Sequence, residues 1–133
     1  MERTTVGSGS PYEPVIGFSR AVRVGHHIAV AGTAPIMPDG GDPPVDAHGQ
    51  AKRCLEIIAT ALDQVGASIH DVVRTRCYLV TAEDWEDVGR AHGDVFGEAS
   101  SDVRPASTMV VVTGFLDPRW RVEMEADAIV GVG

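Results

Sequence analysis

The chain of 133 residues is poor in aromatic side chains and has no cluster of basic residues. It contains two Trp, two Tyr and three Phe, and its 11 Lys and Arg are scattered among 19 Asp and Glu, which gives a net charge of -8. Nucleic-acid binding normally needs a basic surface that displaces counterions from phosphates. The composition therefore argues against a nucleic-acid partner and favours small-molecule chemistry or protein assembly.

Cysteines and long apolar runs are also scarce. The two cysteines, Cys54 and Cys77, lie in a helical pattern and a strand pattern, so no disulfide framework is indicated and a reducing compartment is expected. No apolar run approaches the ~20 residues of a membrane span, and the N-terminus has no apolar signal region. We expect a cytoplasmic protein with no membrane partner. Its length and 44% hydrophobic content fit one domain over residues 1–133.

The common motifs for nucleotide binding, nucleophilic catalysis and metal binding are missing. There is no P-loop, no dinucleotide-binding glycine pattern and no nucleophile elbow. The five histidines include no H-x-x-x-H or H-x-H pair, so we expect no metal site. His92 lies on an apolar helical stripe and Cys77 on a core-facing strand position, and we interpret both as packed side chains.

Short strands are predicted near the start of the chain. Residues 18–24 (FSRAVRV) and 27–31 (HIAVA) have strand character, and Gly25-His26 between them fits a tight turn. Residues 1–11 are small and polar. For these we expect a frayed, poorly ordered start with a short edge strand near Thr4 to Val6.

Two helices are predicted next. Asp46 is placed to cap a helix that runs to about Val65 and stops at Gly66. Thr81 followed by Asp84 resembles a capping box that opens the second helix, and a loop through Ser100–Asp102 follows it. Apolar residues recur at helical spacing in both. In the first helix they are Ala51, Cys54, Leu55, Ile58, Leu62 and Val65, and in the second Trp85, Val88, His92 and Val95 or Phe96.

Three later segments predict strands. Residues 107–113 are apolar and β-branched, whereas residues 72–80 and 121–128 alternate between two faces. In the second segment Val73, Thr75, Cys77 and Leu79 are assigned to one face, and Arg74, Arg76 and Tyr78 to the other. In the last, Arg121, Glu123, Glu125 and Asp127 oppose Val122, Met124, Ala126 and Ala128.

The predicted order is β-β-α-β-α-β-β, a two-layer α+β domain with two helices on one face of a sheet of about five strands. Such a sheet leaves its other face uncovered. An apolar uncovered face needs a partner, so a homo-oligomer is expected.

Two interpretations remain open for the charged residues near the C-terminus. Glu123, Glu125 and Asp127 fit a solvated strand face or cross-strand pairing with Arg74 and Arg76, worth ~0.2–1 kcal/mol per pair. They also fit a site in which Arg104 and one of these acids carry out chemistry.

The sequence resembles the reactive intermediate deaminase A (RidA) family, also called the YjgF family and, in older usage, endoribonuclease L-PSP. The matching stretches are FSRAV (18–22), VAGTAP (30–35), Gln50 through the helix to VGAS (65–68), DVVRTRCYLV (71–80), Phe96-Gly97, RPAST (104–108) and VEMEADAIV (122–130). They cover nearly the whole chain from about residue 12.

The resemblance implies a chorismate-mutase-like fold, a homotrimer and three ligand clefts between subunits. Active members hydrolyse 2-imino acids, or their enamine tautomers, to 2-oxo acids and ammonia without metal or organic cofactor. An arginine holds the substrate carboxylate, and a glutamate positions or activates water. On this resemblance Glu123 and Arg104 are the candidate catalytic residues, and the candidate substrate-binding residues are Phe18, Arg20, Gly32, Ala106 and Thr108.

The chain also departs from the family pattern. Active members read P-A-R-S/T before this strand, so an ungapped match places Ala106 at the arginine and Arg104 two residues upstream. That offset is some 6–7 Å of extended chain. Phe18 replaces a frequent tyrosine, Arg20 a glutamine and Gly89 an asparagine.

Two functional classes are therefore retained. One is an imine or enamine deaminase of weak or shifted activity, with Arg104 or Arg20 holding the anion and Glu123 orienting water. The other is a trimeric protein that binds small carboxylates without catalysis, or an accessory protein of a pathway. An RNase is a distant third, given the acidic charge.

Overall fold

The computed structural model describes residues 2–97 and 103–131 and contains one six-stranded mixed sheet. The spatial order of the strands is β1-β2-β3-β6-β4-β5, so the strand that comes last in sequence lies near the centre. Neighbouring strands are antiparallel except for the parallel pair β4–β5. The strands are β1 (Arg3–Val6), β2 (Ala21–Val24), β3 (His27–Thr33), β4 (Val72–Leu79), β5 (Ala106–Val111) and β6 (Val122–Ile129).

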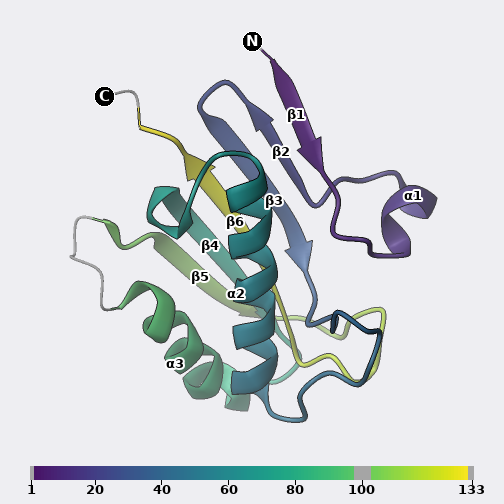
Figure 1. Ribbon diagram of the computed structural model, residues 1–133. Coiled ribbons are helices and arrows are strands. Elements are labelled where there is room, and N and C mark those ends of the chain that lie inside the picture. The colour runs from purple at the N-terminus through teal and green to yellow at the C-terminus, as the bar shows by residue number, and fades with distance from the viewer. Residues whose placement is uncertain (1, 98–102, 132–133) are drawn as a thin grey trace.

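The two long helices lie together on one face of this sheet (Figure 1). They are α2 (Ala47–Gln64) and α3 (Trp85–Phe96), and short 3-10 helices η1 (Ile69–Asp71) and η2 (Ala82–Asp84) precede β4 and α3. The predicted two-layer α+β class is confirmed, with six strands rather than about five. None of the helices in the described part of the chain is long and apolar enough to cross a membrane.

Helix α2 forms as its sequence predicts. The side chain of Asp46 accepts a hydrogen bond from the backbone N–H of Gly49, which satisfies one of the free donors at the helix start. Beyond the helix end, Gly66 has φ of 80°, a conformation that side chains disfavour. All six residues of the predicted apolar stripe are buried.

Strand β6 supplies the centre of the core. Val122, Met124, Ala126 and Ala128 are at most 1% exposed and face the helices, whereas the three acids between them face the other way. The predicted alternation is therefore confirmed, and it fixes which face of the sheet carries the acids.

The face assigned to Val73 is wrong. The pairing of β4 with β6 shifts register between Val72 and Arg74, which indicates a bulge. A bulge inserts one residue and reverses the faces on one side of it. Val72 is consequently buried, and Val73 is 44% exposed.

The predicted position of Trp85 in the core is also wrong. Thr81 caps η2, and α3 begins only at Trp85, whose side chain is 58% exposed. The fully buried positions of α3 are Val88, Ala91 and Phe96.

The N-terminal region contains one helix that the sequence reasoning missed. The single-turn helix α1 (Tyr12–Ile16) follows Pro11 and ends at Gly17, which has φ of 89°. Strand β1 pairs with β2 at the sheet edge, close to the predicted edge strand. The predicted loop at Ser100–Asp102 lies outside the described residues.

Candidate functional site

Glu123 lies on β6, on the sheet face turned away from α2 and α3. It is partly buried, and its partner in register on β4 is Tyr78. Burial raises the pKa of the Glu123 carboxyl, and the positive charge of Arg20 lowers it in part. No described residue donates a hydrogen bond to this carboxylate. A carboxylate in such surroundings is suited to accepting a proton from water.

The two neighbouring acids on β6 are paired. Nη1 of Arg76 lies 3.3 Å from Oε1 of Glu125 and 3.4 Å from Oδ2 of Asp127. The hydroxyl of Tyr78 donates to Oε1 of Glu125 at 2.6 Å, and this bond raises the pKa of Tyr78. Cross-strand pairing therefore accounts for Glu125 and Asp127, and Glu123 alone of the three is left without a donor in the described chain.

Gly32 lies directly against Glu123. A Cβ atom placed on Gly32 would be 3.5 Å from Oε1 of Glu123. The residue before the glycine is part of an irregularity in the β3–β6 pairing, which shifts register between Val30 and Thr33. Glycine thus keeps the strand surface beside the carboxylate free of a side chain.

Arg104 is not brought to Glu123 within one chain. It is exposed, and its Nη2 donates to the carbonyl of Gly97 at 3.0 Å. Glu123 aligns with Tyr78 and through it with Val110 on β5. Arg104 lies six residues before Val110, roughly 20 Å at about 3.3 Å per residue, and two strands away. The two candidate catalytic residues are therefore separated in a single copy.

Ala106 and Thr108 lie on the edge strand β5. They pair in register with Arg74 and Arg76 of β4, respectively. The Arg76 side chain contacts the β6 acids, so Thr108 shares the uncovered sheet face with Glu123. Both residues are exposed and lie across two strand spacings from β6.

Arg20 lies on the helix side of β3. Its side chain is 6% exposed, and Nη1 donates to the carbonyl of Gly32 at 2.7 Å and to Oγ1 of Thr33 at 3.1 Å. The centre of its guanidinium is 5.3 Å from the centroid of the Phe18 ring, a cation–π arrangement. Arg20 thus holds the backbone at Gly32, beside Glu123, from the helix side of the sheet. Its guanidinium does not lie on the uncovered face that bears Glu123.

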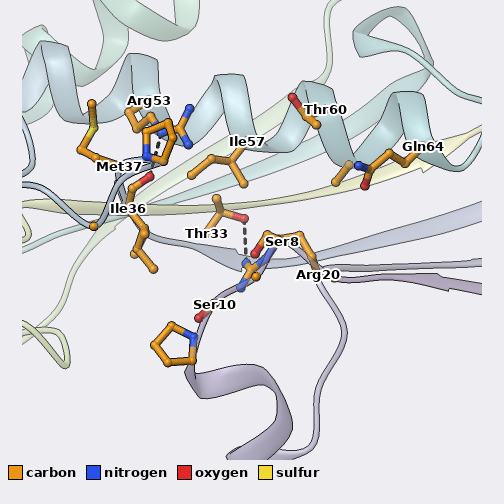
Figure 2. A pocket seen from close by; sticks show the side chains of 17 residues that line it. Ser8, Ser10, Arg20, Thr33, Ile36, Met37, Arg53, Ile57, Thr60 and Gln64 are labelled. Atoms are coloured by element: carbon orange, nitrogen blue, oxygen red, sulfur yellow. Dashed lines mark hydrogen bonds between the residues drawn. The ribbon is translucent and has the colours of Figure 1, made fainter.

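A cavity of about 370 Å³ adjoins Arg20 between α2 and the N-terminal loop (Figure 2). Arg20 and Thr33 line it, whereas Gly32 and Glu123 do not. Sequence reasoning missed this cavity because its walls come from four separate segments. It also missed the bond between Tyr78 and Glu125, since the pairing of β4 with β6 is not visible in either strand alone.

The interpretation of His92 and Cys77 as packed side chains is confirmed. Nε2 of His92 lies 2.8 Å from Oγ1 of Thr75, which donates to Oγ of Ser107 at 2.8 Å. Burial lowers the pKa of His92 and raises that of Cys77 to about 12. Both cysteines are free and buried. Within residues 2–97 and 103–131, no group of three or more His, Cys, Asp or Glu side chains is arranged to hold a metal ion.

Several known proteins are similar to this chain in sequence, and solved structures among them share its fold. A crystal structure from Mycobacterium tuberculosis, of a member of the YjgF/YER057c/UK114 family, is 43% identical with a TM-score of 0.85, over 97% of this chain and 100% of that one. An uncharacterised protein of Streptomyces coelicolor is 39% identical over 130 residues, 95% of this chain and 91% of that protein.

A more distant relative has a stated activity. The 2-iminobutanoate/2-iminopropanoate deaminase of Escherichia coli is 26% identical over 130 residues, 97% of this chain and 98% of the enzyme. The sequence profile of the family described as Endoribonuclease L-PSP matches residues 9–130. The chain therefore belongs to the Endoribonuclease L-PSP family, the family also known as RidA or YjgF.

Proposed function

We propose that this protein hydrolyses small 2-imino acids to 2-oxo acids and ammonia, with low activity, and that Glu123 is the proton-accepting residue. The observation that carries the proposal is the Glu123 carboxylate: partly buried, raised in pKa, without a donor in the described chain, and beside a glycine on an uncovered sheet face. The deaminase activity named for the Escherichia coli relative supports the reaction class.

The chemistry needs only water and one base. Glu123 accepts a proton from water as the oxygen attacks C2 of the substrate C=N bond, and it passes this proton to the nitrogen, which gives a neutral carbinolamine. The same carboxylate then takes the proton of the carbinolamine hydroxyl and delivers it to the amino nitrogen, so that the C–N bond breaks and ammonia leaves as the C=O bond forms. The sum is imino acid plus water to oxo acid plus ammonia. A positioned base of this kind contributes about 10²–10⁴-fold to the rate.

The substrate carboxylate needs a cation near Glu123, and Arg104 of the same chain is too far away. We propose that a neighbouring copy in a homotrimer contributes Arg104, so that the site lies between subunits. The sheet face that bears Glu123 is free of α2 and α3, which leaves it open to such a copy. Guanidinium grips a carboxylate through paired hydrogen bonds worth about 1.5–3 kcal/mol.

Low activity is expected because Arg104 is offset from the family motif. Pro105 follows it and biases its backbone to an extended conformation, which limits adjustment. Misplacing an orienting group by a few ångströms can cost about 100-fold in rate. The bond from Arg104 to the Gly97 carbonyl also holds the side chain along its own chain.

The test is pyruvate release from freshly generated 2-aminoacrylate, which tautomerises to 2-iminopropanoate. We expect slow turnover that falls about 100-fold or more in Glu123→Gln and is unchanged in Glu125→Gln, the matched control on the same strand. Turnover that survives Glu123→Gln would place the base elsewhere. Loss of turnover in Arg104→Ala would support Arg104 as the anion holder, and survival would reject it.

The exposed position of Arg104 favours a second candidate, a trimer that binds small carboxylates without catalysis. Under this alternative the wild type shows no turnover above the uncatalysed rate, while 2-oxobutanoate still binds and Glu123→Gln alters its affinity. Binding without turnover would therefore replace the deaminase proposal.

A further inference from the structure

The cavity next to Arg20 is built from segments that are far apart in sequence. One wall is α2, through Ile57, Thr60 and Gln64, and the opposite wall is the loop at residues 7–11. Figure 2 shows Arg20 on the floor between these walls, with Ser8 and Ser10 close to it and Ile57 above it. Its volume of about 370 Å³ lies within the ~300–1,000 Å³ typical of small-molecule sites.

Arg20 has unused hydrogen-bonding capacity. Nη1 serves the carbonyls of Gly32 and Ala31 and the hydroxyl of Thr33, whereas Nε is enclosed without a hydrogen-bond partner. Nη2 has no partner among the described residues either, and unlike Nε it is not enclosed. A buried cation with unused donors is expensive unless a further acceptor arrives.

Other arginines of this protein show how the Nε and Nη2 donors of a guanidinium can bind a carboxylate. Nε and Nη2 together grip one carboxylate in Arg121, on Asp84, and in Arg119, on Asp117. In Arg20 the same edge faces Glu13, but Oε2 is 3.6 Å from Nε, too long for a hydrogen bond.

Glu13 forms an ion pair with Arg20, with Oε2 3.6 Å from Nε, but the hydrogen bonds of its carboxylate go to the N-terminal loop. Its carboxylate accepts from the backbone N–H of Ser8 at 3.1 Å and from the Ser8 hydroxyl at 2.6 Å. The carboxylate of Glu13 does not line the cavity, and neither does any other acidic side chain. Arg53 does line it and uses Nε on the carbonyl of Ile36. In a chain with net charge -8, two arginines therefore border a cavity that has no acidic lining.

The remaining lining is apolar with a few hydroxyls. Ile36, Met37 and Ile57 provide the apolar part, and Ser8, Ser10 and Thr60 provide hydroxyls. A ligand that fits this distribution has one anionic end and a short hydrocarbon body. We propose that the cavity is a binding site for a small aliphatic carboxylate, whose carboxylate meets Nη2 of Arg20 and the Ser10 hydroxyl.

This site is separate from the Glu123 site of the proposed deaminase. Side chains alternate along β3, so Gly32 borders Glu123 on one side of the strand while Thr33 borders the cavity on the other. The two sites share only the backbone that Arg20 holds. Occupation of the cavity thus does not require the Glu123 carboxylate.

The experiment titrates the full-length protein with hexanoate and follows binding by calorimetry and by amide NMR shifts. Hexanol is the uncharged control. Hexanol cannot make the charge-assisted hydrogen bonds, which contribute about 1.5–3 kcal/mol. Its affinity should therefore be about tenfold or more lower than that of hexanoate. We expect shifts at residues 8–11, 33–37 and 57–64.

Four variants locate the site. Ile57→Trp fills the cavity and should weaken hexanoate about tenfold or more, whereas Glu56→Trp adds the same group on an exposed position of the same helix and should not. Arg20→Lys keeps a charge but removes the Nη2 donor, and it should weaken binding similarly. Glu123→Gln should leave hexanoate affinity unchanged.

Several results would overturn the proposal. These are equal affinity for hexanoate and hexanol, unaltered binding in Ile57→Trp, or loss of hexanoate binding in Glu123→Gln, which would assign the ligand to the other face. Binding of inorganic phosphate in preference to hexanoate would reject the aliphatic carboxylate as the ligand class. None of these outcomes depends on whether the protein is a deaminase.

Discussion

Arg121 and Asp84 join the start of β6 to the start of α3 through two hydrogen bonds. Nη2 of Arg121 lies 2.7 Å from Oδ1 of Asp84, and Nε lies 3.1 Å from Oδ2. The Asp84 side chain is 5% exposed and that of Arg121 41%. The hydrogen bonds that Arg121 donates to Asp84 raise the pKa of Arg121. A buried carboxylate therefore depends on one arginine from a strand 37 residues away.

We expect Arg121→Ala to lower the free energy of unfolding by about 1–2 kcal/mol, because it leaves Asp84 buried without its charged partner while solvent screens part of the pair. Arg90→Ala is the matched control, since Arg90 and Asp87 form an exposed pair within α3. That change should cost no more than about 0.5 kcal/mol. Urea unfolding of both variants measures the difference, and equal losses would contradict the assignment.

Glu123→Gln should stabilise the protein at neutral pH. Burial raises the folded-state pKa of Glu123 above the ordinary value of 4.5, so the folded state binds this proton more tightly than the unfolded state. The stabilising contribution is fully present below the unfolded value and is lost as pH rises through the folded value. The glutamine variant, which carries no charge, avoids that loss.

The measurement is the melting temperature of Glu123→Gln and wild type at pH 4 and pH 7. We expect the variant to exceed wild type only at the higher pH. Glu125→Gln is the control, and it should destabilise at pH 7 because its carboxylate accepts from Tyr78 and Arg76. A lower melting temperature for Glu123→Gln at pH 7 would show that Glu123 gains a donor in the assembled protein.

Thr75→Val tests the polar contact beneath α3. Thr75 is 1% exposed, and its hydroxyl lies 2.8 Å from both Nε2 of His92 and Oγ of Ser107. Valine keeps the shape but removes the hydroxyl, so we expect a loss of about 1–2 kcal/mol in the free energy of unfolding. Thr108→Val, on an exposed position of β5, should change it by less than about 0.5 kcal/mol. A neutral effect of Thr75→Val would show that the contact contributes nothing net.

The expected homotrimer has a specific test. Val110 pairs with Tyr78, whose side chain lies on the uncovered sheet face, and Val110 itself is 43% exposed. If that face is buried between copies, Val110→Asp should produce monomers in sedimentation at micromolar concentration, whereas wild type sediments as a trimer. Val15→Asp, on α1 at 85% exposure, should leave the assembly unchanged. A monomeric wild type would reject the trimer.

Local patterns predicted those parts of the fold that local physics decides. The cap at Asp46, the apolar stripe of α2 and the alternation of β6 each involve residues a few positions apart, and all three are observed. The errors arise where distant segments intervene. The bulge after Val72 depends on pairing with β6, and the exposure of Trp85 depends on where η2 ends.

The candidate site divides in the same way. The sequence correctly separates the acids of β6 from the core, but it does not show that Arg76 and Tyr78 pair with Glu125 and leave Glu123 alone. Nor does it place Arg20 on the helix side of β3, because that position depends on the Gly32 carbonyl and the Thr33 hydroxyl. Such distinctions require the register between strands.

The central place of β6 also leads us to expect a particular order of folding. Strands β3 and β4 both pair with β6, and in the sheet order they do not pair with each other. During synthesis, we therefore expect the strands before residue 122 to form at most two separate pieces of sheet, β1-β2-β3 and β4-β5. Closure waits for the last strand and brings together segments nearly 100 residues apart, the kind of non-local pairing that slows folding. Until then both edges that will receive β6 stay open to other chains.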